Sequence, residues 1–245
     1  MNICAIIQAR LGSTRLPKKL FLELSGKPLI WHVINRLTFS KQISKILLAT
    51  TDQNIDDELV DWSKKNNIDY FRGDENDVLS RYYFCAKKFK ADIIIRITSD
   101  DPFKDPFLID RLIETLLNEK LDFIFNNYPP SYPEGLDTEI FTFDALEKAY
   151  LNTNSNYDRE HVTQFFYKNI ELFNTRNILN NENLSNYRWT IDTQLDYELI
   201  RKIYELLYEN NKLFNMKDIL NLYEDFPFLH EINCKVKRSD MYKNL

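Results

Sequence analysis

Four cations follow the first apolar run of the chain, in the segment IIQARLGSTRLPKK, which contains no carboxylate. They are Arg10, Arg15, Lys18 and Lys19. Gly12, Ser13 and Thr14 lie between the arginines, so backbone N–H groups, hydroxyls and guanidinium groups could converge on one anion. Because guanidinium groups suit bidentate contacts to phosphate, we interpret this segment as a triphosphate-binding loop.

The spacing within this loop differs from two common phosphate-binding motifs. It has neither the G-x-x-x-x-G-K-[ST] pattern of a Walker loop nor the G-x-G-x-x-G pattern of a dinucleotide-binding turn. A solvated basic loop is the alternative interpretation. The two arginines that bracket Gly-Ser-Thr favour the phosphate-binding one.

Carboxylates follow two other predicted strands. Asp100 and Asp101 come directly after the apolar run ADIIIRI, and Asp192 ends the segment RWTID. Two carboxylates brought together from separate strands can hold Mg²⁺, a cation that takes oxygen ligands and bridges phosphates. Asp100 could instead be a turn residue and Asp192 a helix N-cap. The sequence leaves open whether Asp100 or Asp101 is the ligand.

Alternating strand and helix patterns must position these groups. The first two thirds of the chain read as repeated strand–helix units, which predicts an α/β fold with a mostly parallel sheet and helices on both faces. Ligands of such sheets bind at the carboxyl ends of the strands. The expected strands are residues 2–8, 44–50, 69–72, 91–97 and 121–127; the expected helices are residues 27–37, 54–65, 76–89 and 105–117, the last with Asp105 as N-cap.

The regular alternation ends at the proline-rich segment YPPSYPEGLD. TEIFTF then reads as a strand outside the parallel run, YRWTID as a last strand, and residues 196–208 as an amphipathic helix. We expect one domain over residues 1–245, with an acceptor-side lobe at 128–190 and C-terminal helices and a tail at 209–245. The alternating tail FPFLHEINCKVKR suggests an edge strand or dimer arm, and so a homodimer.

The chain has only four glycines, so each is informative. We interpret Gly12 and Gly135 as positions near a ligand, where a close approach or a positive φ needs glycine. For Gly26 and Gly73, simple turn geometry is an equally good interpretation.

Composition excludes several classes of function. The net charge of -5 disfavours a broad nucleic-acid face or binding to an anionic membrane. Three scattered cysteines give neither a disulfide framework nor zinc-ligand spacing, and three histidines nearly exclude a multi-histidine metal site. The N-terminal apolar run is too short for a signal peptide or a membrane span. We expect a cytoplasmic protein that binds small molecules.

Seven segments, in order, resemble the SpsF-type (spore coat polysaccharide) cytidylyltransferases, which are relatives of the CMP-sialate and CMP-Kdo synthetases. They are AIIQARLGSTRLPKKLFLELSGKPLIWHVI, LLATTD, FRGDENDVLSRYY, IIIRITSDDPFKDP, YPEGLDTEIF, REHVT and RWTIDT. The resemblance runs from Asn2 to about residue 208. Its specificity lies in the order of the seven segments together.

The resemblance implies a Rossmann-like nucleotidyltransferase fold with a small inserted acceptor or dimerisation lobe. It also implies Mg²⁺-dependent transfer of CMP from CTP, with release of pyrophosphate, to a small anionic acceptor for surface polysaccharide biosynthesis. Acceptors in the wider family are sugar acids and phosphorylated metabolites, including phosphorylated amino acids. A nucleotide-sugar-dependent glycosyltransferase and a non-catalytic nucleotide-binding protein are the alternatives.

The resemblance also implies roles for individual residues. The catalytic residues would be Arg10, Arg15, Lys19 and Asp100, with Lys18 as a supporting charge at a position where relatives often have glycine. The nucleotide-binding residues would be Ala9, Gly12, Ser13, Thr14, Arg72, Asp77 and Thr98, and the metal ligands Asp100 and Asp192.

The segments EGLDTE and YDREHVT offer a polar set suited to a hydroxylated, anionic acceptor. Its members are Asp137, Glu139, Arg159, Glu160, His161 and Thr163. A salt-bridged surface helix is the alternative for Arg159 and Glu160.

Overall fold

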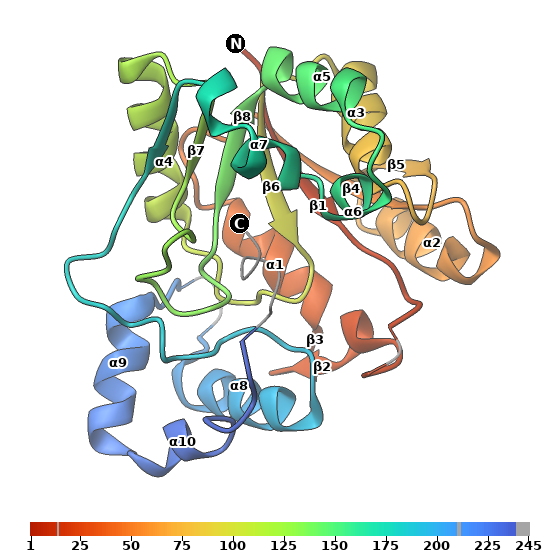
Figure 1. The fold of residues 1–245 in the computed structure, drawn as a ribbon. Helices are drawn as coiled ribbons and strands as arrows, with labels where there is room; N and C mark the ends of the chain where they lie inside the picture. The colour runs from red at the N-terminus through yellow and green to blue at the C-terminus, as the bar shows by residue number, and fades with distance from the viewer. Residues whose placement is uncertain (14, 210–211, 239–245) are drawn as a thin grey trace.

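The computed structural model describes residues 1–13, 15–209 and 212–238 (Figure 1). Its centre is a seven-stranded sheet with the strand order β5-β4-β1-β6-β8-β7-β9. The strands β5, β4, β1 and β6 are parallel neighbours, as the strand–helix alternation predicts. The bounds are β1 Ile3–Gln8, β4 Lys45–Thr51, β5 Asp69–Gly73, β6 Ile93–Thr98, β7 Phe123–Phe125, β8 Glu139–Thr142 and β9 Thr175–Asn177.

The central strands are apolar on both faces because helices cover both. In β1, Ile3, Ala5 and Ile7 pack into one core cluster, while Cys4 and Ile6 pack into the other. The first cluster lies under α1 (Leu29–Leu37) and α4 (Pro106–Glu119), and the second under α3 (Val78–Phe89) and α5 (Phe143–Asn152). The prediction of helices on both faces is confirmed.

The register of the sheet sets where the polar loops begin. Gln8 at the end of β1 is paired with Thr98 at the end of β6. The basic loop after β1 and the Asp100 loop after β6 therefore leave the same edge of the sheet, side by side. This edge is where open α/β sheets bind ligands.

The other helices are α2 (Asp57–Lys65), α6 (Asn156–His161), α7 (Gln164–Lys168), α8 (Gln194–Leu207), α9 (Met216–Asp225) and α10 (Phe228–Glu231), with 3-10 turns at η1 (Lys19–Phe21), η2 (Asn54–Asp56) and η3 (Ile170–Leu172). The helices α8, α9 and α10 gather below the sheet in Figure 1. A short hairpin, β2 (Glu23–Leu24) with β3 (Lys27–Pro28), turns at Gly26, whose φ of 79° explains that glycine. Within the described residues, no helix is both long and apolar enough to cross a lipid bilayer.

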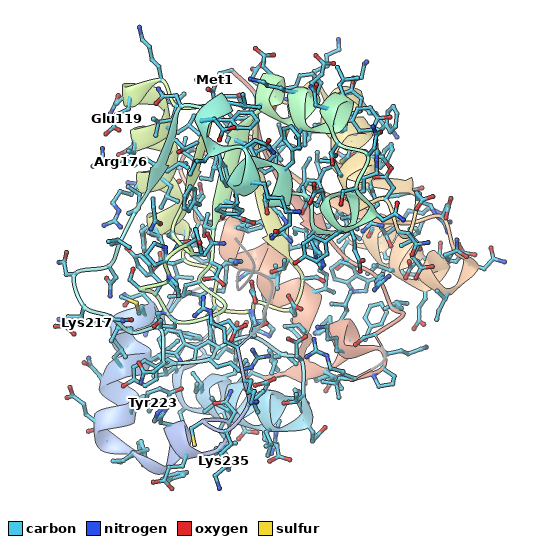
Figure 2. All side chains as sticks on the ribbon, viewed as in Figure 1. Met1, Glu119, Arg176, Lys217, Tyr223 and Lys235 are labelled. Atoms are coloured by element: carbon cyan, nitrogen blue, oxygen red, sulfur yellow. The ribbon has the colours of Figure 1, made fainter. Side chains whose placement is uncertain are left out.

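The second half of the chain completes the sheet. The predicted strand outside the parallel run is β8, which is antiparallel to both β6 and β7. At the sheet edge, Arg176 of β9 forms an ion pair with Glu119 at the end of α4 (Figure 2). The division into lobes at 128–190 and 209–245 stays a prediction, although β8 and β9, within the first of these ranges, belong to the main sheet.

Two expected strands are wrong. The segment 187–192 is extended, but within the described chain it forms a single β-bridge, between Arg188 and Glu134, and it also donates a backbone hydrogen bond from the Ile191 N–H to the Asp100 carbonyl oxygen. The tail predicted as an edge strand instead begins with the short helix α10. The buried residues of this segment are instead spaced as in a helix, because Leu229 and Asn233 are both buried and lie four residues apart. The homodimer stays a prediction without this support.

Candidate active site

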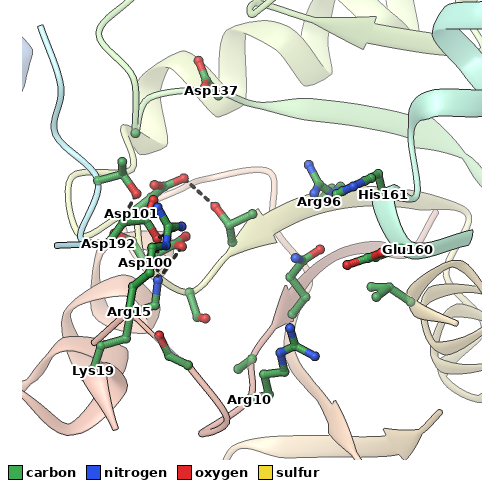
Figure 3. Close-up of a pocket in the computed structure, with 18 of the residues that line it drawn as sticks. Arg10, Arg15, Lys19, Arg96, Asp100, Asp101, Asp137, Glu160, His161 and Asp192 are labelled. Atoms are coloured by element: carbon green, nitrogen blue, oxygen red, sulfur yellow. Dashed lines mark hydrogen bonds and ion pairs between the residues drawn. The ribbon is translucent and has the colours of Figure 1, made fainter. Parts of the chain in front are cut away.

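A cavity of about 460 Å³ opens at the carboxyl ends of β1 and β6 (Figure 3). Figure 3 shows Arg15, Lys19, Asp100 and Asp192 gathered on one side of it, with His161 on the other. The structure therefore brings most of the predicted site together. The predicted residues that line the cavity are Ala9, Arg10, Gly12, Ser13, Arg15, Lys19, Thr98, Asp100, Asp137, Glu139, Glu160, His161 and Asp192.

Lys19 lies between the two carboxylates that the sequence singles out. Its Nζ is 2.8 Å from Oδ2 of Asp100 and 3.0 Å from Oδ1 of Asp192, and it also donates to the carbonyl oxygen of Ile191 at 2.9 Å. Burial would lower the pKa of Lys19, but the two carboxylates outweigh it and raise that pKa. Lys19 is therefore a fixed positive charge at neutral pH.

Asp192 is not a helix cap. Thr193 caps α8 through a capping box with Asp196, which leaves the Asp192 carboxylate to other partners. Its Oδ1 is 2.9 Å from Arg15, in addition to Lys19, and its Oδ2 is 2.9 Å from Arg188. The Asp192 carboxylate therefore lies at the cavity wall in contact with three cations.

Arg188 is a site residue that the sequence did not reveal. Its guanidinium is buried and contacts Glu134 at 2.6 Å and Asp196 at 3.0 Å, as well as Asp192. Burial would lower the pKa of Arg188, but Asp196 and Glu134 outweigh it and raise the pKa. Arg188 thus fixes the position of Asp192 against the end of α8. The only available signal was its place at the start of RWTID.

The structure also distinguishes Asp100 from Asp101. Asp101 is buried, accepts a hydrogen bond from Thr98 and forms an ion pair with Lys104 at 2.9 Å. Asp100 instead shares Lys19 with Asp192. Burial would raise the pKa of Asp100, but Lys19 outweighs it and lowers that pKa, so Asp100 stays ionised. Of the two, Asp100 is the carboxylate that converges with Asp192.

This pair of carboxylates fits a divalent cation in donor type and in convergence. Both offer carboxylate oxygens to one positive charge, which here is the Lys19 ammonium. Within the described part of the chain, no group of three or more His, Cys, Asp or Glu side chains could hold a metal. Mg²⁺ commonly takes one or two carboxylates and completes its shell with water and phosphate oxygens, so two are sufficient.

Of the four cations in the basic loop, Arg10, Arg15 and Lys19 line the cavity and Lys18 does not. Arg10 pairs with Glu75 at 3.1 Å at the cavity wall, and both side chains are exposed enough to meet a ligand. Lys18 pairs with Glu58 at 2.7 Å outside the cavity lining, and its φ of 53° accounts for a preference for glycine there. Thr14 lies outside the described residues.

Four predicted residues are held by protein partners outside the cavity lining. Arg72 donates to the carbonyl oxygens of Thr51 and Gln53 and pairs with Asp57. Asp77 caps α3, accepting from the Ser80 N–H, and pairs with Arg159 at 2.6 Å, an ion pair of the kind that the salt-bridge alternative expects. Thr163 is fully buried. A nucleotide or acceptor contact for these four residues, Arg72, Asp77, Arg159 and Thr163, stays a prediction.

The opposite side of the cavity is formed by buried charges and one strained turn. Glu139 pairs with Arg96 of β6 and accepts a hydrogen bond from Tyr167 at 2.8 Å. Next to them, the N–H of Thr163 donates to the carbonyl oxygen of His161, and Val162 between them has a φ of 54°. A β-branched residue in this γ-turn is strained, and the turn places His161 at the cavity. Arg96 is a further residue of the cavity lining that the sequence analysis did not include, although a charged residue inside the apolar strand ADIIIRI could have indicated it.

Gly135 lies at the cavity because its backbone packs against the segment that carries Asp192. It has a φ of 105°, and an added Cβ would lie 2.7 Å from the Trp189 carbonyl oxygen. We expect Gly135→Ala to lower the free energy of unfolding by roughly 2 kcal/mol or more, and to reduce activity by moving the backbone before Asp192. Urea unfolding measures the first effect.

Gly26→Ala is the matched control for this variant. Gly26 also has a positive φ, but an added Cβ would meet nothing within 4 Å. It should cost only about 1 kcal/mol, the backbone penalty alone. Equal losses in the two variants would contradict the close approach at Gly135.

The fold and this site define a nucleotidyltransferase: a mostly parallel sheet whose carboxyl edge carries a basic loop and a cation held between two carboxylates. The family model described as cytidylyltransferase matches residues 4–219, and the chain belongs to this family. Within it, the chain is 32% identical to the spore coat polysaccharide biosynthesis protein SpsF of Bacillus subtilis over 83% of this chain and 87% of that protein. The SpsF-type membership inferred from the sequence is confirmed.

The chain is also similar to other proteins and solved structures. An uncharacterized protein of Methanocaldococcus jannaschii is 37% identical over 97% of each chain. The structure of a cytidylyltransferase from Leptospira borgpetersenii has a TM-score of 0.89 and 34% identity, covering 94% of this chain and 97% of that one. A CMP-2-keto-3-deoxy-manno-octonic acid synthetase complexed with CTP shares the fold, with a TM-score of 0.66 and 18% identity over 85% of this chain and all of the other.

Proposed function

We propose that this enzyme transfers CMP from CTP to a small anionic acceptor and releases pyrophosphate, with Mg²⁺ held by Asp100 and Asp192. The observation that carries the proposal is the position of Lys19, the last cation of the basic loop, between these carboxylates. This arrangement offers several positive charges to a polyphosphate at the edge of the sheet where nucleotides bind. The CTP complex of the structurally similar synthetase supports the choice of nucleotide.

In the proposed reaction, an acceptor oxygen attacks the α-phosphorus as the bond to the β-phosphate oxygen breaks. Negative charge accumulates on the leaving pyrophosphate. Arg10, Arg15 and Lys19 would stabilise that charge more strongly in the transition state than in bound CTP. When bound at Asp100 and Asp192, Mg²⁺ would neutralise charge on the phosphate oxygens.

The acceptor would occupy the side of the cavity lined by Asp137, Glu139 and His161. These side chains can form hydrogen bonds with the hydroxyl groups of an acceptor. Cationic side chains that line the same cavity can bind its carboxylate or phosphate group. A sugar acid or a phosphorylated metabolite, such as a phosphorylated amino acid, would meet both requirements. The spore coat polysaccharide role of the SpsF relative supports a place in surface polysaccharide biosynthesis.

A coupled pyrophosphate assay tests this function. With Mg²⁺ and a panel of sugar acids and phosphate monoesters, we expect acceptor-dependent pyrophosphate release from CTP, and much less from ATP, GTP or UTP. Equal release from all four nucleotides with a good acceptor would reject the base preference. Binding of CTP without turnover would favour a non-catalytic nucleotide-binding protein. Turnover of nucleotide sugars without release of pyrophosphate would favour a glycosyltransferase.

We also propose that the enzyme is a cytoplasmic homodimer. Light scattering at micromolar concentration measures the oligomeric state, and a mass corresponding only to the monomer would contradict the homodimer.

A further inference from the structure

The C-terminal segment returns to the cavity after α10. Asn233 is buried, and its side-chain amide donates to the carbonyl oxygen of Arg188 at 3.0 Å and to Asp196 at 2.9 Å. The chain after α10, in dark blue in Figure 1, then runs from the lower helices toward the sheet. Five residues after Asn233, Arg238 lines the cavity. The segment is therefore fastened to the same network that positions Asp192.

Arg238 meets Asp137 on the acceptor side. Its Nη2 lies 3.0 Å from one carboxylate oxygen of Asp137 and 3.2 Å from the other, while Nη1 donates to the Ser185 carbonyl oxygen at 3.4 Å. Both side chains of the ion pair are 24% exposed. A ligand in the cavity can therefore reach this guanidinium.

The other cations on this side are less accessible. Lys104 is 1% exposed and is held by Asp101 and by the backbone carbonyl of Asp137. Arg96 is 9% exposed and pairs with the buried Glu139. Among the described cations near Asp137 and Glu139, Arg238 is the most exposed.

Asp137 compensates the charge of Arg238 only in part. Burial raises the pKa of Asp137 to about 7, although Arg238 and Lys104 act in the opposite direction. An anion that stays fully charged at neutral pH would be a stronger partner for the guanidinium.

We propose that Arg238 binds the anionic group of the acceptor, a carboxylate or a phosphate monoester, and that Asp137 holds its guanidinium in place until the acceptor binds. The inference rests on the proposed function for the identity of the acceptor. It makes the C-terminal segment part of the binding site and Arg238 a determinant of acceptor specificity.

Binding is measured separately from turnover. We would titrate 3-deoxy-manno-octulosonate, a sugar acid, and glycerol 3-phosphate, a phosphate monoester, by calorimetry into enzyme saturated with CTP in the presence of EDTA. Saturation with CTP blocks the basic loop, and EDTA prevents turnover. Arg238→Gln should weaken the better-bound probe by about tenfold or more, and Arg238→Lys by less, because it keeps the charge but loses the planar fork. The probe that binds distinguishes a carboxylate from a phosphate acceptor.

Lys237→Gln is the matched control, because Lys237 is the exposed neighbour of Arg238. It should bind the probe as the unchanged enzyme does. With an acceptor that supports turnover, Arg238→Gln should raise the KM for that acceptor and leave the KM for CTP unchanged.

Equal affinity of the unchanged enzyme and Arg238→Gln for the better-bound probe would overturn the inference, as would a failure of both probes to bind the unchanged enzyme. If no acceptor supports pyrophosphate release, the proposed function is contradicted. The role of Arg238 is then decided by the binding measurement alone.

Discussion

Asp192→Asn is expected to lower turnover by roughly 10²-fold or more while the protein stays folded. The substitution keeps nearly the same volume but removes the negative charge that would hold Mg²⁺ with Asp100. Arg188, the buried partner of Asp192, keeps Glu134 and Asp196, so no buried charge is left unpaired. Initial rates of pyrophosphate release with CTP and saturating Mg²⁺ measure the effect.

Binding of CTP separates this effect from damage to the nucleotide site. Without metal, the affinity of Asp192→Asn for CTP should stay the same or rise, since Arg15, Lys19 and Arg188 lose a competing anion. Asp105→Asn is the matched control, because Asp105 only caps α4 and asparagine also caps well. Near-normal Mg²⁺-dependent turnover in Asp192→Asn would contradict a metal shared by Asp100 and Asp192.

Lys19→Ala is expected to weaken both CTP binding and turnover. Without metal, it leaves Asp100 and Asp192 without the Lys19 charge, so the two carboxylates would repel the polyphosphate; during turnover, the leaving pyrophosphate would lose a cation. Loss of one such transition-state contact costs roughly 3–4 kcal/mol, a reduction in turnover of about 10²- to 10³-fold. Calorimetry with CTP and steady-state rates measure the two losses.

The neighbouring Lys18 provides a control within the same loop. Lys18→Gln removes a cation that pairs with Glu58 outside the cavity lining, and it should leave CTP binding and turnover nearly unchanged. Similar losses in the Lys18 and Lys19 variants would mean that the loop acts only through its total charge. That result would contradict a specific role for Lys19.

The side of the cavity that carries the basic loop and Asp100 was predictable because these residues follow directly after strands. A basic loop after one strand and a carboxylate after its neighbour must meet at the edge of a parallel sheet, and Gln8 and Thr98 are indeed paired there. Asp192 was predictable for a different reason. Its expected strand did not form, yet the extended segment still leads Asp192 to the same edge.

The contacts that the sequence did not reveal join residues far apart in the chain. Arg188 reaches Glu134 over 54 positions, and Arg238 reaches Asp137 over 101 positions. Local sequence patterns do not predict such long-range contacts. For the same reason the sequence does not show that Arg159 pairs with Asp77, and its predicted acceptor contact stays a prediction.

The most direct test of the central claim follows the α-phosphorus of CTP. With CTP labelled at that atom, Mg²⁺ and an anionic acceptor, we expect the label to appear in a CMP–acceptor conjugate, with one pyrophosphate released for each conjugate formed. Label that remains in CTP with every acceptor, or that appears only as free CMP, would contradict the proposed transfer.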